Sequence, residues 1–193
     1  MRFVRSARSA ASRARAGASV RGRAVGLLLA IGPRLSDALR REAPPRLAAR
    51  LAHEDDPEIR AKLIEVVASY EYRSPSALNA LEAIARRTQE PATERDRAIS
   101  ALARFPQPRA LTALAEMVDL LPDALRTHAI ERLRDATGQP SAPNSATWLR
   151  VLHGMDKDLK KRLATVEEAE AKAADERRTA AERKREAIRK AGE

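Results

Sequence analysis

The stretch LAHEDDPEIRAKLIEVVASY, residues 51–70, contains the pattern that decides the fold. After Asp56-Pro57, apolar side chains recur at the three- and four-residue spacing of an amphipathic helix. Proline lacks the amide donor that a helix interior needs but is accepted in the first turn, so it ends one helix and begins the next. The acidic residues before Pro57 favour the same start, because a helix N-terminus attracts negative charge. The stretch therefore predicts two short helices joined by a tight connection.

The second of these helices recurs twice along the chain. An arginine, two residues, an apolar residue, three residues and another apolar residue occur in RAKLIEVV from Arg60, RDRAISAL from Arg95 and RTHAIERL from Arg126. An amphipathic segment precedes each copy, and VRGRAVGLL at residues 20–28 fits the spacing as a degenerate fourth. One helix pair cannot bury both apolar faces, whereas stacked pairs cover each other. The repeat predicts an all-α fold, a short α-solenoid of helix pairs over residues 33–137.

Proline-containing breaks set the predicted helix bounds. They occur at Pro44-Pro45, Asp56-Pro57, Ser74-Pro75, Glu90-Pro91, Pro106 to Pro108 and Pro122. The predicted helices cover residues 34–43, 46–53, 57–70, 75–88, 93–104, 107–120 and 123–136.

Charge is distributed unevenly along the chain. The net charge is +10, and eight arginines that precede the first acidic residue, Asp37, contribute +8 of it. Residues 44–137 hold 14 basic and 15 acidic side chains, so the predicted solenoid is nearly neutral. It carries no excess of positive charge for binding phosphates. The chain has no cysteine, which excludes disulfides and thiolate metal sites.

Residues 1–32 are expected to be a basic tail or a targeting segment. Their composition is compatible with a transit-type presequence, with the n-region of a signal peptide, or with a basic arm for anionic partners. The apolar run AVGLLLAIG, residues 24–32, is too short to span a bilayer and could instead be the first core helix. We expect a cytoplasmic protein, the alternative being export with residues 1 to about 38 as a signal sequence.

Two further segments follow the predicted repeats. Residues 138–154 contain Trp148, the only tryptophan, which is expected to pack over the end of the solenoid as a cap rather than to stack on a ligand. Gly138 suits the left-handed residue that ends a helix. Residues 155–193 hold 12 basic and 10 acidic residues and no proline, which predicts a long charged helix docked at its start. Its large apolar residues are too sparse for a sustained coiled-coil seam.

The quoted stretch resembles the HEAT-like repeats typified by relatives of phycocyanobilin lyases, in which Asp-Pro-x-x-Arg begins the second helix. The resemblance covers residues 44–137 and is strongest in the first copy, since the others replace Asp-Pro with PATER and PDALR. The segment LRDATGQPSAPNSATWLRVL also resembles the end of such arrays in some bacterial HEAT proteins. The resemblance implies an α-solenoid and protein binding, and it implies no reaction.

Candidate functional residues follow from the repeat register. Arg60, Arg95 and Arg126 are interpreted as structural residues that brace the turn between paired helices, a binding ladder being the alternative. The second helices are expected to present rows of polar residues, either to a partner or simply to solvent. Two and five positions after each arginine, these rows comprise Lys62, Glu65, Arg97, Ser100, His128 and Glu131.

The sequence therefore predicts a non-catalytic scaffold that binds a protein or peptide through its second helices. No catalytic residue, metal site or cofactor is proposed, because the three histidines are far apart and no phosphate-binding or nucleophile motif occurs. The alternative is a nucleic-acid-associated protein that uses the Arg-rich N-terminal tail. The identity of the partner and the oligomeric state stay open.

Overall fold

The computed structural model describes residues 19–69 and 72–191, in which every regular element is a helix. A helix over residues 19–31 and a 3-10 turn, η1 (Gly32–Arg34), come first. The helices α2 (Asp37–Ala52), α3 (Pro57–Ala68), α4 (Pro75–Arg86), α5 (Ala92–Ala103), α6 (Pro108–Met117), α7 (Asp123–Thr137), α8 (Ser145–Gly154) and α9 (Asp156–Ala191) follow, with the 3-10 turn η3 (Val118–Leu120) between α6 and α7.

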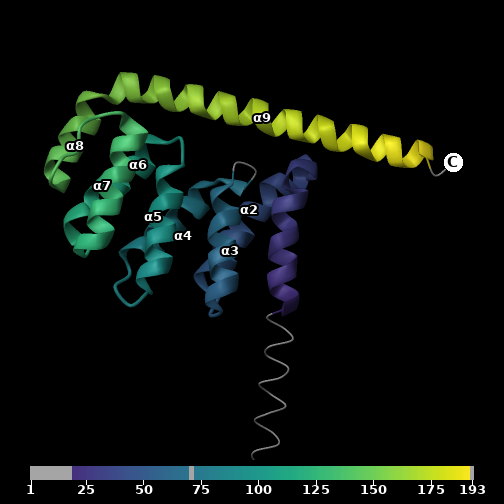
Figure 1. The fold of residues 1–193 in the computed structure, drawn as a ribbon, viewed down its shortest axis with the longest axis horizontal. Coiled ribbons are helices and arrows are strands. Elements are labelled where there is room, and N and C mark those ends of the chain that lie inside the picture. The colour runs from purple at the N-terminus through teal and green to yellow at the C-terminus, as the bar shows by residue number, and fades with distance from the viewer. Residues whose placement is uncertain (1–18, 70–71, 192–193) are drawn as a thin grey trace, which may run out of the picture.

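The helices form two stacked layers (Figure 1). In the first layer α4 packs between α2 and α6, and α6 packs against α8. In the second layer α5 lies between α3 and α7, and the core continues through both layers. Each pair therefore covers the apolar faces of its neighbours, which confirms the all-α, solenoid-like fold predicted from the repeat.

Short polar residues before proline or alanine fix where the helices begin. Asp56 accepts hydrogen bonds from the amides of Glu58 (3.0 Å) and Ile59 (3.2 Å), and Ser74 Oγ accepts from the amide of Ala77 at 3.1 Å. These bonds satisfy amides that have no partner within the helix. The acidic cap predicted before Pro57 is thereby confirmed.

The predicted break at Pro44-Pro45 is wrong. Both prolines lie inside α2, which runs without interruption where two helices, 34–43 and 46–53, were expected. Neither proline can donate to the carbonyl four residues earlier, so the helix loses two of its hydrogen bonds there. Burial of the face that carries Ala48 (4% exposed) and Leu51 (1% exposed) keeps the two halves in one helix.

Helix 19–31 belongs to the stack rather than to a separate tail. Val25 is buried in the core, and the Tyr72 hydroxyl donates to the carbonyl of Leu28 at 2.7 Å. A Cβ on Gly22 would meet Lys62 and Ile59 of α3, so the two helices lie side by side. The apolar run is thus the helix that the core-helix alternative anticipated, while residues 1–18 of the expected tail lie outside the described residues.

The other end of the stack is formed by α8 and the start of α9. Trp148 is fully buried in α8, which packs on α6. Gly138 ends α7 with φ at 69°, the left-handed conformation predicted for it. Arg162 of α9 donates to the carbonyl of Thr137, the last residue of α7.

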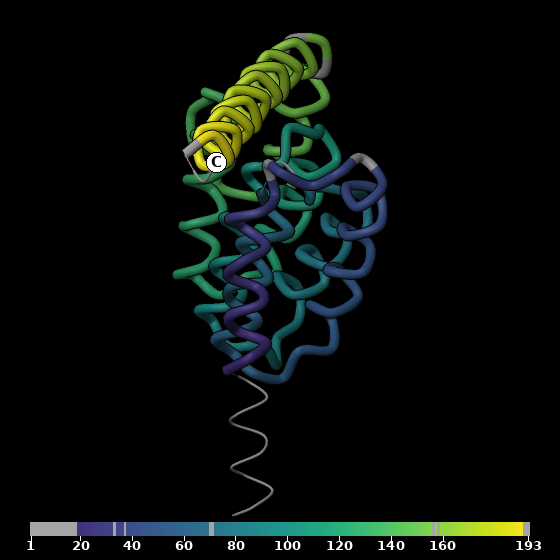
Figure 2. The backbone as a smooth tube through the Cα atoms, turned by 90° about the vertical axis from the view of Figure 1, so that its right-hand side faces the viewer, coloured from purple at the N-terminus to yellow at the C-terminus, as the bar shows by residue number. Residues whose placement is uncertain are grey.

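Helix α9 then crosses the ends of the stacked helices and reaches η1 beside helix 19–31 (Figures 1 and 2). Leu159, Leu163 and Ala174 are buried on its inner face. It is therefore docked from Leu159 to the part that contacts η1, further than the expected contact at its start alone.

Candidate partner-binding surface

The three repeat arginines make equivalent contacts. Arg60 Nε donates to the carbonyl of Glu54 at 2.7 Å, Arg95 Nε to that of Ala85 at 3.0 Å, and Arg126 Nε to that of Val118 at 3.2 Å. Each guanidinium thus bonds the end of the first helix, or the turn after it, from the start of the second. Such a contact is what a bracing role requires, because it satisfies carbonyls left over at a helix end.

Arg60 also links two repeats through carboxylates. Its Nη1 lies 2.5 Å from Glu90 Oε2 and 2.8 Å from Glu94 Oε2, and Glu94 is nearly fully buried. Burial lowers the pKa of Arg60, but the hydrogen bond and charge of Glu94, with the charge of Glu90, outweigh it and raise that pKa above its ordinary value. Arg60 therefore stays charged and ties α3 to α5.

Glu54 lies in the turn before α3, as Glu90 lies in the turn before α5. It is 2% exposed, and Arg50 Nη2 donates to its carboxylate at 2.6 Å. Burial raises its pKa, but hydrogen bonds from Arg50 and the Asp56 amide, with the charges of Arg50 and Arg21, hold the pKa below its usual value. The turn is thus built around a buried carboxylate that is paired and ionised.

The structure places the six predicted partner-binding residues in three situations. Glu65, Arg97 and Glu131 are exposed on α3, α5 and α7 respectively. Lys62 is exposed on α3 and lines a groove between this helix and helix 19–31. Ser100 and His128 are half-buried and in contact, since Ser100 Oγ lies 3.2 Å from His128 Nε2.

Two residues that the sequence analysis did not single out complete the contact between α5 and α7. His128 Nδ1 bonds Asp96, and Arg132 Nε donates to His128 Nε2 at 2.7 Å. Because Arg132 can only donate, Nε2 is the acceptor and Nδ1 carries the proton. The order Asp, His, Ser is that of a hydrolytic triad, but here Arg132 occupies the nitrogen that would have to take the serine proton. The network suits joining two helices rather than activating Ser100.

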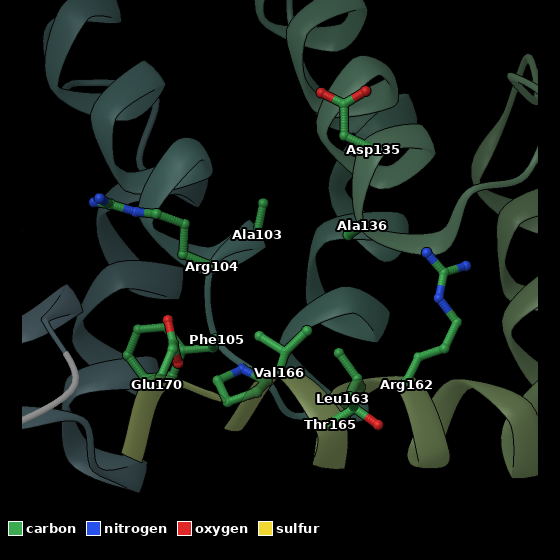
Figure 3. Close-up of a pocket in the computed structure, with 11 residues that line it drawn as sticks. Ala103, Arg104, Phe105, Asp135, Ala136, Arg162, Leu163, Thr165, Val166 and Glu170 are labelled. Atoms are coloured by element: carbon green, nitrogen blue, oxygen red, sulfur yellow. The ribbon is translucent and has the colours of Figure 1, made fainter. Parts of the chain in front are cut away.

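A groove of about 490 Å³ opens where the ends of α5 and α7 meet α9 (Figure 3). Phe105, Pro106, Leu163 and Val166 supply its apolar lining, and Val166 is 47% exposed. Charged side chains of both signs surround this lining. They are Arg104, Asp135, Arg162 and Glu170. A second groove, lined in part by Ser100 and Arg132, shares Arg104 and Asp135 with it, so the surface continues from α9 onto the second helices.

Arg73, in the connection between α3 and α4, fixes one wall of this groove. Its guanidinium lies over the Phe105 ring, 5.5 Å from the centroid, and its Nη2 donates to Glu170 Oε1 of α9 at 3.0 Å. The arginine thereby positions α9 relative to the aromatic ring by a cation–π contact and an ion pair. This contact could not be predicted from the sequence, because Arg73 and Glu170 are 97 residues apart.

Within residues 19–69 and 72–191, no group of His, Asp and Glu side chains is arranged to hold a metal ion. In the same part of the chain, no helix is long and apolar enough to cross a membrane.

Comparison with known proteins gives one family. Residues 44–134, just under half of the 193-residue chain, match the family model described as HEAT repeats. No curated protein and no solved structure matches the chain. The matched residues begin within α2 and end within α7, the part in which helix pairs stack in two layers. HEAT repeats commonly serve as scaffolds for protein interaction and are generally not catalytic. Over residues 44–134 this chain is therefore similar to HEAT-repeat proteins.

Proposed function

We propose that the chain is a non-catalytic scaffold that binds a protein or peptide through the exposed face of its second helices, α3, α5 and α7. The groove between α5, α7 and α9 is the observation that carries this proposal. Its apolar lining with a rim of both charges suits an extended segment with an apolar anchor and flanking charged residues. Arg97 and Glu131 extend the same face beyond the groove.

The buried polar groups support a structural rather than a chemical role. In the described part, Glu54, Glu94, Arg95 and Thr137 are the buried polar or charged side chains, and each is bonded within the protein. A reactive group needs access to a substrate, whereas these groups hold helices and turns together. We accordingly propose no catalytic residue and no cofactor.

Photocrosslinking in the native host tests this proposal. A photoreactive benzoylphenylalanine replaces, one at a time, Arg97, Arg104 or Glu131, with Leu120 and Ile188 as equally accessible positions away from the face. We expect one discrete protein adduct from the first three positions and none from the last two. Adding Val166→Asp should reduce this adduct about tenfold, because it places a charge in the apolar lining, and Val166→Thr should preserve it. An adduct that forms equally from Leu120, or that survives Val166→Asp, would contradict the proposal.

The rival function, nucleic-acid association through the Arg-rich tail, is favoured only by the charge of the first 36 residues. Removal of residues 2–18 separates the two functions, because it spares helix 19–31 and the stack. If the scaffold proposal is right, the protein adduct persists while retention on heparin falls. Loss of the adduct together with heparin retention would favour the rival.

We further propose a cytoplasmic location. Signal cleavage near residues 30–40 would remove helix 19–31, which packs on α3 and contributes Val25 to the core. Mass spectrometry of the N-terminus in the native host is expected to find these residues retained. A mature chain that begins after residue 30 would show export instead.

A further inference from the structure

Helix 19–31 ends the second layer and leaves one face uncovered by the described residues. Figure 2 shows this helix, in purple, in front of the rest of the stacked helices, with the end of α9 in yellow above it. One face, with Gly22 and Val25, is turned to α3. Four apolar residues spaced i, i+4, i+7 and i+11 lie on another face, within an arc of about 60° at 100° per residue. These residues, the apolar stripe, are Val20, Ala24, Leu27 and Ile31.

The apolar stripe is open to solvent to an unusual degree. Val20 is 59% exposed, Leu27 is 61% exposed and Ile31 is 39% exposed. Large aliphatic side chains are often partly exposed singly, but a row of them along one helix marks an interaction surface. Gly22 and Val25, which face the stack, are not part of the stripe.

Exposed arginines lie close to the stripe. Arg23 is exposed on the same helix, and Arg34 is exposed just after it. They are two of the eight arginines that precede Asp37, and no acidic residue lies among these eight. The partner of this face must therefore accept aliphatic side chains and also supply negative charge.

We propose that helix 19–31 binds the surface of an anionic lipid bilayer. The helix lies parallel to the membrane, the apolar stripe enters the boundary between headgroups and acyl chains, and Arg23 and Arg34 pair with lipid phosphates. Lipids are laterally mobile, so they can match arginines that are scattered along the sequence. The contact is peripheral, in keeping with the shortness of the helix.

Other occupants fit this face less well. A second copy docked on the stripe would bring two stretches of +8 together without an intervening acid, and like charges at an interface oppose association. A nucleic acid would pair with the arginines, but it would leave the stripe in water. The lipid surface satisfies both the aliphatic side chains and the charge.

This inference is independent of the proposed protein-binding function, because it uses the end of the stack rather than the groove at α5, α7 and α9. It adds a way in which the helical stack is anchored to a lipid bilayer. A stack held to a membrane by helix 19–31 keeps the exposed face of α5 and α7 available to a partner.

Vesicle flotation with the full chain tests the proposal. The probes are vesicles of phosphatidylcholine alone and of phosphatidylcholine mixed with phosphatidylglycerol. We expect the chain to float with the mixed vesicles and not with phosphatidylcholine alone. The double variant Val20→Ser, Leu27→Ser should bind at least about tenfold more weakly, because two inserted side chains are lost. The matched control is Leu120→Ser, Ile188→Ser, whose residues are 66% and 65% exposed elsewhere, and it should bind like the parent chain.

Three outcomes would overturn the proposal. Unchanged vesicle binding by the Val20, Leu27 variant would show that the stripe does not insert. A dimer in sedimentation velocity that this variant converts to a monomer would show that a second copy covers the stripe. Equal binding to vesicles of phosphatidylcholine alone and to the mixed vesicles would show that negative charge on the lipid is not what this face recognises. Circular dichroism checks that each variant keeps its helix content.

Discussion

Glu54 illustrates how single residues join the repeats. It is withdrawn from solvent at the turn before α3, where Arg50 and the Asp56 amide bond its carboxylate. Its pKa is lower in the folded chain than in the unfolded chain, so its ionised form favours folding. This contribution is fully present above the unfolded pKa and is lost as the pH falls through the folded pKa.

Replacement of Glu54 by glutamine is therefore expected to lower the free energy of unfolding by about 1 to 3 kcal/mol at neutral pH. The difference from the parent chain should shrink as the pH falls into the acid range. Urea unfolding at a series of pH values measures this, with Glu131→Gln as an exposed control that should change little. A difference that stays constant down to acid pH would contradict the role given to the Glu54 carboxylate.

Gly138 offers a second test at the residue scale. Its φ is 69°, and a Cβ there would lie 2.8 Å from Nη1 of Arg162. Gly138→Ala should destabilise the fold by about 1 to 2 kcal/mol through backbone strain, and it should also disturb the contact between α7 and α9. Gly26→Ala, where a Cβ meets nothing within 4 Å, should instead stabilise helix 19–31 by about 0.5 to 1 kcal/mol. Equal effects of the two substitutions in thermal unfolding would argue against this account.

The repeat register predicted which residues share the polar face of the second helices, but not the contacts between them. Ser100 lies five positions after Arg95 and His128 two positions after Arg126, so they belong to the two different rows, and the structure brings them into contact. The contact of Asp96 could not be predicted, because the equivalent position is alanine in the first copy and threonine in the third, so the repeat shows no polar row there. The groove could not be predicted, because it depends on where α9 crosses the stack.

At the scale of elements, capping residues predicted where helices begin when the packing of the helices favoured the same boundary. Asp56 and Ser74 predicted the starts of α3 and α4, and their side chains bond the first amides. The pair Pro44-Pro45 was misjudged, since the packing of α2 on α4 outweighs the hydrogen bonds that proline removes. The sequence around Pro44 does not show how strongly α2 packs on α4, so the uninterrupted helix could not be predicted from it.

Helix α9 provides the prediction at this scale. Its inner face is buried at Leu159, Leu163 and Ala174, whereas Ile188 is 65% exposed. Backbone amides up to the contact with η1, at about Glu182, should exchange with solvent slowly, and those beyond it should exchange faster, because the end of the helix is not held by packing. Hydrogen exchange read by mass spectrometry checks this. Uniform protection from Asp156 to Ala191 would mean that the end of the helix is also covered.

In the whole molecule, helix pairs stack by translation rather than folding into a compact bundle. In the stack, α5 lies between α3 and α7 and contacts both. In a compact bundle, α3 and α7 would also contact each other. The repeat in the sequence and the two layers in the structure both rest on this arrangement.

The chain has no cysteine, so spin labels can be attached at introduced cysteines without background. Labels at Lys62, Arg97 and Glu131 report on the exposed faces of α3, α5 and α7. Pulsed electron spin resonance should give a separation of roughly 10 Å between neighbouring helices and roughly twice that between Lys62 and Glu131. A distance between Lys62 and Glu131 no longer than the two neighbouring distances would contradict the stacked arrangement.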